Sequence, residues 1–515
     1  MANRNIFSTL FSGVSATDAI NEAGGVAYRL TAEQALAQFS ATGCFNDTYY
    51  ASAETQLDDV RKLAFEVDVH FLAQCAVYAR QRGGMKDAPA FLCAVLAKRD
   101  PAVLASVFDR VIDNGKMLRN FVQMVRSGVT GRRSLGTAPK RMVRGWFEAR
   151  TCEEVFRQSV GQQPSMADVL KLARPKPSNR RRSALYGYMI GKSVDTSVLP
   201  PLVQTFEAYK ATRQGELPKV PFQMLTALDL DREAWTAIAQ NASWQMTRMN
   251  LNTFLRHGVF EDAAMVEHVA ERLRDPLLVK KAKVFPYQLL SAYLAAEDAP
   301  KLIREALQDA MEIAIDNVPS FDGRVVVCPD VSGSMGSPAT GYRKGSTSKV
   351  RCIDVAALMA AAVLRKNRRA EVLPFDFNVK RLDINPRDSV MSNAQRLTNA
   401  WGGGTNCAAP LRYLNQRRQK ADLVIYVSDN ESWLGRAHGH GTSMMEEWTD
   451  FKRHNRGAKL VCIDIQPYGT TQASSQANIL NVGGFSDAVF DVVAAFAKAK
   501  SGADHWVRAI MEVRV

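Results

Sequence analysis

The chain has 515 residues, 46% hydrophobic and 23% charged, which is ordinary for a folded protein of two or more domains. No apolar stretch approaches the ~20 residues of a membrane span, and no secretory leader is evident, so we expect a cytoplasmic protein without a membrane anchor. The eight cysteines are scattered and form no Cys-x-x-Cys pair, a pattern that indicates reduced thiols rather than disulfides or a zinc site.

The first three hundred residues predict helices almost throughout. Residues 1–20 have no clear period, and we expect them to be mobile. From about Glu54, apolar residues recur at three- and four-residue spacing, as in Leu57, Val60 and Ala64, and breaks such as Asp100-Pro101 separate about fifteen short helices. Paired short helices favour an α-solenoid of degenerate HEAT-type repeats that curves or closes, although an irregular all-α globule would show the same pattern.

Positive charge is concentrated in one part of this helical region. The whole chain carries a net charge of +14, and Gly131–Lys192 alone carries +10, from fourteen basic and four acidic residues. Such a concentration predicts a surface for a polyanion, although a solvated basic face is the alternative. The candidate RNA-binding residues are Arg132, Arg133, Lys140, Arg141, Arg144, Arg157, Lys171, Arg174, Lys176, Arg180, Arg181 and Arg182.

Two features of this basic segment favour RNA. Arg180–Arg182 are predicted to begin a helix, where cations oppose the helix dipole, so a bound phosphate would explain their presence. Aromatic residues lie between the arginines in the sequence, and arginine with aromatic side chains suits single-stranded or irregular RNA, whose bases can stack. These aromatic residues are Trp146, Phe147, Tyr186 and Tyr188.

After about Pro319 the pattern changes to alternating strands and helices. Short β-branched runs separated by helices predict a mainly parallel sheet with helices on both faces. The order of the strands in this sheet does not follow from the pattern. The predicted strands are 324–328, 370–375, 422–427, 459–465 and 478–482, and the predicted helices are about 349–366, 391–400, 407–418, 443–455 and 485–500.

Polar side chains follow three of these predicted elements. Asp330, Ser332 and Ser334 come after the first strand, Thr405 follows a run of three glycines, and Asp429 ends the strand 422–427. Ligands bind at the carboxyl ends of parallel strands, and hard oxygen ligands suit Mg²⁺. Each residue alone could instead cap a helix or a turn, so the prediction of a metal site depends on their combination.

This combination resembles the metal-ion-dependent adhesion site of von Willebrand factor A domains, in which D-x-S-x-S, G-G-G-T and a strand ending in aspartate recur. The resemblance implies that Ser332 and Ser334 bind the metal directly and Thr405 directly or through water. Asp330 and Asp429 would act mostly through water. A carboxylate of a partner would fill the open metal position, so the site would bind rather than catalyse.

Nearly the whole chain, about 25–500, resembles the TROVE family, the bacterial relatives of the Ro autoantigen. The carrying motifs are PSMADVLKLARPKP from Pro164, MNLNTFLRHGVF from Met249 and VFPYQLLSAYL from Val284. The resemblance implies a ring of HEAT-like repeats over 21–318, closed by a von Willebrand factor A domain over 319–515.

The same resemblance implies an RNA-binding scaffold of a small ribonucleoprotein that serves RNA quality control or the stress response. Y-like noncoding RNA would bind the basic outer surface, where Arg157, Lys171 and Arg174 fall on basic or histidine positions of the family and Gly161 on a basic one. Single-stranded 3′ ends of misfolded RNA would enter the hole of the ring. A 3′-to-5′ exoribonuclease is the implied partner, and we expect a monomer.

Two rival functions remain open from the sequence. One is a protein-interaction module, in which the A domain recruits a protein through the metal without specific RNA binding. The other is a metal-dependent nuclease or phosphatase at Asp330, which we disfavour because no second carboxylate pair or general base is evident beside it, and two hydroxyl ligands suit a two-metal site poorly. We therefore expect no enzymatic activity.

Overall fold

A computed structural model describes residues 14–282, 284, 286–343, 348–367, 369–429, 431–432, 441–485, 487–498 and 505–515. The chain forms two compact units, one of Met1–Leu63 with Ala270–Glu512 and the other of Ala64–Val269 with Val513–Val515. Among the described residues, no helix is both long and apolar enough to cross a membrane.

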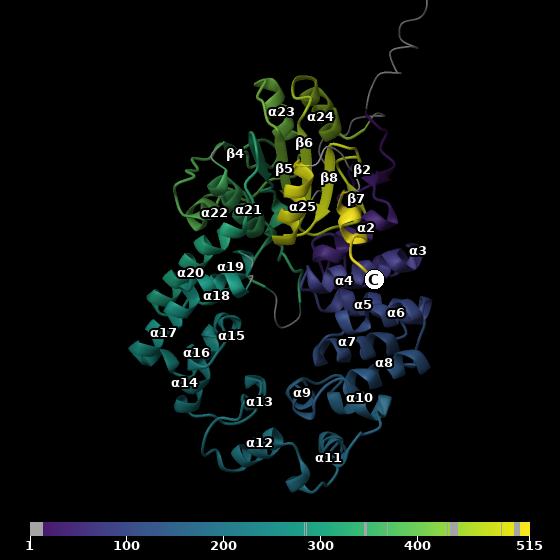
Figure 1. Ribbon diagram of the computed structural model, residues 1–515. Coiled ribbons are helices and arrows are strands. Elements are labelled where there is room, and N and C mark those ends of the chain that lie inside the picture. Colours follow the sequence, from purple (N-terminus) through teal and green to yellow (C-terminus); the bar gives the residue numbers. More distant parts are fainter. Residues whose placement is uncertain are drawn as a thin grey trace, which may run out of the picture. The chain divides into compact units, whose positions relative to one another are not determined.

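The second unit is built from short helices, which succeed one another along the chain in Figure 1. Helices pack on near neighbours in sequence, for example α4 on α5 and α6, α5 on α7, and α6 on α8, as helical repeats do. The elements are α4 (Val69–Gln81), α5 (Asp87–Arg99), α6 (Pro101–Val111), α7 (Gly115–Arg126), α8 (Thr137–Glu148), α9 (Cys152–Arg157), α10 (Met166–Ala173), α11 (Arg180–Met189), the 3₁₀ helix η2 (Thr196–Val198), α12 (Pro201–Thr212), α13 (Phe222–Leu225), α14 (Arg232–Gln240), α15 (Trp244–Met249), α16 (Leu251–Arg256) and η3 (Val259–Glu261).

Side-chain caps begin many of these helices. Asp100 accepts hydrogen bonds from the backbone N–H groups of Ala102 and Val103, and Pro101 occupies the first turn, as its fixed φ allows. Ser165 and Asp168 form a reciprocal capping box at the start of α10. The predicted break at Asp100-Pro101 is therefore confirmed.

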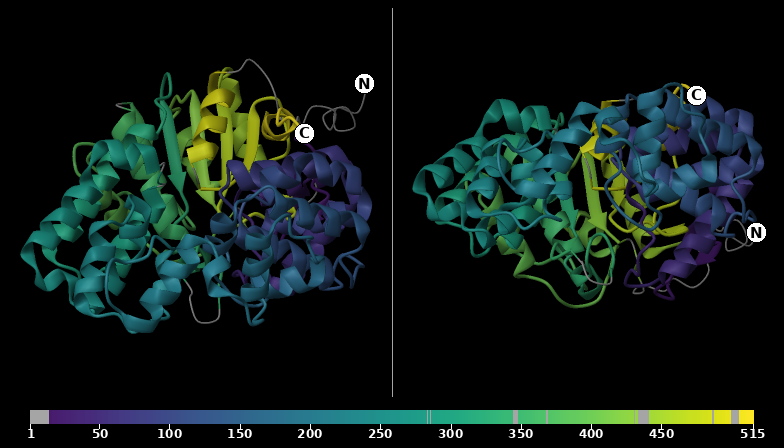
Figure 2. Two further views of the ribbon diagram at one scale, coloured as in Figure 1. Left: turned by 60° about the horizontal axis from the view of Figure 1, so that its bottom comes forward. Right: turned by 90° about the horizontal axis from the view of Figure 1, so that it is seen from below.

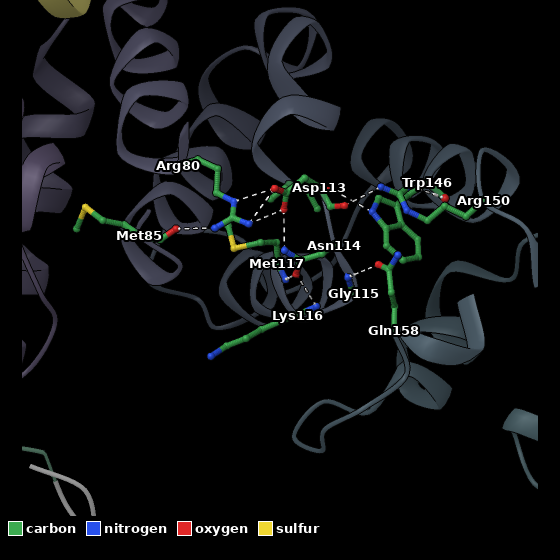
Figure 3. Close-up of polar contacts among 11 residues, drawn as sticks. Arg80, Met85, Asp113, Asn114, Gly115, Lys116, Met117, Trp146, Arg150 and Gln158 are labelled. Atoms are coloured by element: carbon green, nitrogen blue, oxygen red, sulfur yellow. Dashed lines mark hydrogen bonds and ion pairs between the residues drawn. The ribbon is translucent and has the colours of Figure 1, made fainter. Parts of the chain in front are cut away.

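The turn between α6 and α7 locks neighbouring repeats together (Figure 3). The Asp113 carboxylate pairs with Arg80 of α4 at 2.8 Å, and its backbone carbonyl accepts from Arg150 at 3.0 Å. The Arg150 guanidinium stacks 3.8 Å from the centroid of Trp146, whose indole N–H donates to Ile112 O at 2.9 Å. Cation–π contacts and charge-assisted hydrogen bonds thus join α4, α7 and α8 in one half-buried network.

The first unit contains a five-stranded parallel sheet in the order β4-β3-β5-β6-β8. Its strands are β3 (Val325–Pro329), β4 (Ala370–Val372), β5 (Leu423–Ser428), β6 (Lys459–Asp464) and β8 (Ile479–Gly483). Its other elements are α17 (Ala263–Arg274), α18 (Pro276–Ala282), α19 (Pro286–Ala295), α20 (Lys301–Ala314), η4 (Ile315–Asn317), η5 (Gly333–Gly336), α21 (Cys352–Lys366), α22 (Val390–Thr398), α23 (Ala409–Gln416), α24 (Ser443–His454), β7 (Thr470–Thr471), α25 (Asp487–Lys498) and α26 (His505–Met511).

The sheet is buried between helices, as Figure 2 shows from two sides. Every residue of β3 and β5 is buried, which explains why both read as continuous apolar runs rather than alternating ones. Side chains of α23 and α24, including Trp448 and Phe451, pack on Val326, Val424 and Leu460. The predicted helical region followed by a parallel α/β domain is confirmed, and the five predicted strands match the observed ones within a few residues.

Residues before Leu63 belong to the same compact unit as this sheet. They form β1 (Ala19–Ile20), β2 (Val26–Arg29), α2 (Ala32–Thr42) and the start of α3 (Ala53–Glu66). β2 pairs antiparallel with β7, with Tyr28 opposite Thr471, and α2 packs on β8. The expectation of helices alone before residue 300 was wrong here, because strands of two and four residues are too short to show a period. The expected mobility of 1–20 concerns 1–13, which lie outside the described residues, and 14–20, which include β1.

Candidate metal centre and nucleic-acid interface

The predicted metal ligands gather at the point where the sheet reverses its winding. The chain passes from β3 to β4 on one side and then to β5 on the other side of β3. Asp330 follows β3 and Asp429 follows β5, so both stand at the carboxyl ends of adjacent strands at this switch point. Open parallel sheets form their ligand sites at such points.

The Asp330 carboxylate is held by two donors. The backbone N–H of Ser332 donates to Asp330 Oδ1 at 2.8 Å, and the Ser428 hydroxyl donates to Oδ2 at 2.6 Å. Asp330 has no exposed surface, and its own N–H donates to Val427 O at 2.9 Å. The carboxylate is therefore fixed in position before any ligand arrives.

The three predicted hydroxyl ligands lie together beside it. The Thr405 hydroxyl donates to Ser332 Oγ at 2.9 Å, and Ser332 Oγ lies 3.4 Å from Ser334 Oγ, at the long limit of a hydrogen bond. The side chain of Ser334 also hydrogen-bonds to Asp429. The structure thus brings all five predicted ligands together, and all five are buried.

The glycine loop explains how Thr405 reaches this position. The N–H of Gly333 donates to Gly403 O at 2.9 Å, and the N–H of Gly402 donates to Val331 O at 2.8 Å. Gly403 has a φ of 85°, and a Cβ there would lie 2.5 Å from Asp376 Oδ2. Only glycine meets both conditions, so the loop can lie flat against the strand that carries Asp330.

The electrostatics of this cluster favour a cation. Burial, together with the nearby charge of Asp429, raises the pKa of Asp330 to about 7, and burial also raises the pKa of Asp429. Asp464 at the end of β6 is buried too, and its Oδ1 has no hydrogen-bond partner among the described residues. Buried carboxylates with few cationic neighbours and several hydroxyl oxygens fit a divalent cation such as Mg²⁺, which would stabilise their ionised forms. No group of three histidine, cysteine or acidic side chains in the described part of the chain could hold a metal, so the hydroxyls are essential to this fit.

Two residues of this site were missed by the sequence reasoning. Ser428 orients Asp330, and Glu431, which is 1% exposed, lies in the same loop as Asp429. Ser428 could have been found from its place at the carboxyl end of a buried strand next to Asp429. The burial of Glu431 depends on residues before position 30, and no local pattern shows it.

The predicted RNA-binding residues divide into exposed and anchored groups. Arg182 is buried, and its guanidinium donates to Phe147 O at 2.5 Å and to Arg150 O at 2.7 Å. It holds backbone carbonyls at the end of α8 and is not available to RNA, which corrects its assignment. Three half-buried arginines also donate to backbone carbonyls, namely Arg132 to Leu135 O, Arg144 to Ala173 O and Arg157 to Lys219 O, and Lys140 is half-buried as well. The exposed members are Arg133, Arg141, Lys171, Arg174, Lys176, Arg180 and Arg181.

The exposed cations of α10 and α11 line a groove of about 710 Å³. Lys171, Arg174, Arg180 and Lys192 contribute to its walls, and Asp195 is the acidic residue among the described lining residues. Arg174 ends α10 in the left-handed conformation, with a φ of 51°. The groove therefore combines a strong positive charge with room for a phosphate backbone.

The aromatic part of the sequence argument was wrong. Trp146 and Phe147 are fully buried, and Tyr186 is 8% exposed. These rings pack edge-to-face on one another inside the helical unit, so they cannot stack on RNA bases. Tyr188 is half-buried, and its hydroxyl donates to Glu207.

Comparison with known families explains the pairing of these two sites in one chain. Residues 165–371 match the TROVE domain, and residues 324–497 match the Ro60 vWA domain. The chain belongs to the TROVE family. The TROVE match includes the basic groove, and the Ro60 vWA match includes all five predicted metal ligands.

Individual TROVE relatives extend this similarity along the chain. The RNA-binding protein RO60 of Deinococcus radiodurans is 26% identical over 520 residues, which covers 93% of this chain and 95% of the relative. RNA-binding protein RO60 of Caenorhabditis elegans is 24% identical over 257 residues, 46% of this chain and 38% of the relative. The crystal structure of the Deinococcus radiodurans RO (RSR) protein is similar in fold, with a TM-score of 0.65 and 24% identity, over 91% of this chain and 99% of that one.

Proposed function

We propose that this protein binds RNA, and that the groove between α10 and α11 is part of its RNA-binding surface. The convergence of Lys171, Arg174, Arg180 and Lys192 on one groove carries the proposal, because phosphate contacts from such cations supply most of the affinity for nucleic acid. The RNA-binding relatives in the TROVE family support RNA as the polyanion.

Within this function we propose the finer roles that the family resemblance implies. The groove and the exposed arginines around it would bind a small, structured, Y-like noncoding RNA. Single-stranded 3′ ends of misfolded RNA would be further ligands, delivered to a 3′-to-5′ exoribonuclease for quality control or during stress. The protein would act as a cytoplasmic monomer without catalytic activity, and its A domain would dock a partner's carboxylate through Mg²⁺.

The salt dependence of RNA binding tests the groove. We expect the affinity for a folded hairpin RNA with a single-stranded 3′ extension to fall steeply with salt. Arg174→Glu with Arg180→Glu should reduce the slope of log affinity against log salt by about two, one for each lost phosphate contact. Glutamate at position 180 suits the first turn of α11, so this change should not weaken the helix.

The matched control makes the same charge change elsewhere. Arg381 and Arg387 are exposed residues of the other compact unit, and Arg381→Glu with Arg387→Glu should leave the salt slope unchanged. Equal affinities of all three proteins at every salt concentration would exclude the groove and favour a protein-interaction module. The RNA should stay intact throughout, since degradation that purifies with the protein would contradict the absence of catalysis. Sequencing the RNA that copurifies from the native host would identify the ligand.

A further inference from the structure

The polypeptide before α3 lies against two of the loops that form the metal centre. We call residues 14–52 the N-terminal segment. The Asn21 side chain donates to Ser432 O at 2.9 Å, and the N–H of Ala23 donates to Glu431 Oε2 at 3.3 Å. Both acceptors belong to the loop after β5, two and three residues beyond Asp429. The segment therefore contacts the metal centre on the side of Asp429.

The N-terminal segment also contacts the loop after β3. The Asn46 side chain donates to Thr340 O at 2.8 Å, and the N–H of Tyr342 donates to Asp47 O at 2.6 Å. These contacts hold residues 46–50 beside the loop that carries Ser332 and Ser334. Two separate parts of the segment thus meet the two strand ends of the candidate site.

Tyr50 carries this contact into the metal centre itself. Its ring packs edge-to-face on Tyr468 at 6.0 Å, and the Tyr468 hydroxyl donates to Thr48 Oγ1 at 3.0 Å, so the ring is held from two sides. The Tyr50 phenol hydrogen-bonds to the side chain of Ser334. Burial and the nearby charge of Asp429 raise the pKa of Tyr50, so the phenol keeps its proton and remains a donor.

The hydrogen-bonding capacity of Ser334 shows what this contact does. A serine hydroxyl has one donor and two acceptor lone pairs. Its proton serves the bond to Asp429, and one lone pair accepts from Tyr50. The remaining lone pair is left for a cation, and its direction is set by the other two partners.

We propose that Tyr50 is a positioning residue of the metal centre, and that the N-terminal segment covers this centre in a way that depends on the metal. The inference rests on the proposed metal site. Tyr50 orients Ser334 for the cation, and the cation in turn strengthens the attachment of the segment. Because such coupling is reciprocal, removal of Tyr50's hydroxyl must weaken metal binding by the same factor by which metal release loosens the segment.

The test compares two adjacent tyrosines in the full-length protein. Tyr50→Phe keeps the ring and removes only the hydroxyl that meets Ser334. Tyr49→Phe is the matched control, since Tyr49 is 56% exposed and stands beside Tyr50 without a described contact to the metal ligands. Mn²⁺ affinity, measured by electron paramagnetic resonance, should fall about tenfold in Tyr50→Phe, as loss of a supporting partner of a ligand typically does, and stay unchanged in the control.

Hydrogen exchange supplies the reciprocal measurement. Amides of residues 46–52 should exchange more slowly with Mg²⁺ than with a chelator in the native protein and in Tyr49→Phe, and this difference should shrink in Tyr50→Phe. Equal Mn²⁺ affinity of the native protein and Tyr50→Phe would overturn the role of Tyr50 alone. Failure of the native protein to bind Mn²⁺ would overturn the metal site and this inference together. An equal loss of stability in Mg²⁺ and in chelator would assign Tyr50 a purely structural role and also contradict the proposal.

Discussion

Arg181 and Arg182 are adjacent in sequence and opposite in environment. Arg181 is exposed, whereas Arg182 is 9% exposed and donates to the carbonyls of Phe147 and Arg150. The run of three arginines shows no difference between them, because the burial of Arg182 depends on where α11 meets the end of α8. Charge density in a sequence therefore locates a basic face but does not tell which cations on it are free.

This pair gives a direct prediction about stability. Arg182→Ala should lower the free energy of unfolding by about 1–3 kcal/mol, because two buried carbonyl groups would lose their donors. Arg181→Ala should change it by no more than about 0.5 kcal/mol. Urea denaturation followed by circular dichroism measures both. Similar losses in the two variants would show that the buried contacts of Arg182 do not contribute as described.

The metal centre allows a second prediction at the level of single residues. Mg²⁺ at a hundred times its dissociation constant should stabilise the native protein by about 2.7 kcal/mol, because it binds only the folded site. Ser332→Ala with Ser334→Ala should remove this stabilisation by deleting two proposed ligands. Ser428→Ala keeps every proposed ligand and loosens only Asp330, so it should reduce the effect without removing it. Thermal unfolding with Mg²⁺ and with chelator measures the differences, and equal Mg²⁺ effects in all variants would contradict the assigned ligands.

Among the elements, the strands of the A domain were predictable and the N-terminal strands were not. Val325–Pro329 and Leu423–Ser428 are buried on both faces, so their apolar runs are unmistakable in the sequence. Their adjacency was not predictable, because hydrophobic pattern carries no information on strand order. The convergence of Asp330 with Asp429 was therefore expected only by resemblance, and the order β4-β3-β5-β6-β8 supplies its physical reason. β2 is stabilised by pairing with β7 more than 400 residues later, which local sequence cannot reveal.

The contact of α2 with β8 gives a prediction at this scale. A Cβ on Gly483 would lie 2.5 Å from the backbone oxygen of Gln38 and 2.9 Å from its Cα, so helix and strand meet here backbone to backbone. Gly483→Ala should displace α2 and destabilise the protein by about 1–3 kcal/mol. Gly457→Ala is the control, since a Cβ there meets nothing within 4 Å. Chemical denaturation compares the two, and an unaffected Gly483→Ala protein would indicate that α2 moves without cost.

For the whole molecule, the decisive question is whether the two candidate sites act independently. The basic groove is formed by residues of Ala64–Val269, and the metal centre by residues of the other compact unit. No described ligand of the proposed cation belongs to the groove. We therefore predict that Ser332→Ala with Ser334→Ala leaves RNA affinity and its salt slope unchanged while it removes the stabilisation by Mg²⁺.

The reverse experiment completes this prediction. Arg174→Glu with Arg180→Glu should weaken RNA binding and keep the full Mg²⁺-dependent shift in thermal unfolding, because neither arginine is near a proposed metal ligand in sequence or within its compact unit. Mutations at independent, distant sites have additive effects, so a protein with all four substitutions should lose both properties by the sum of the separate changes. A loss of RNA affinity in the serine variant, or a non-additive loss in the combined one, would reveal energetic coupling between the sites. The cation would then regulate RNA binding as well as partner docking.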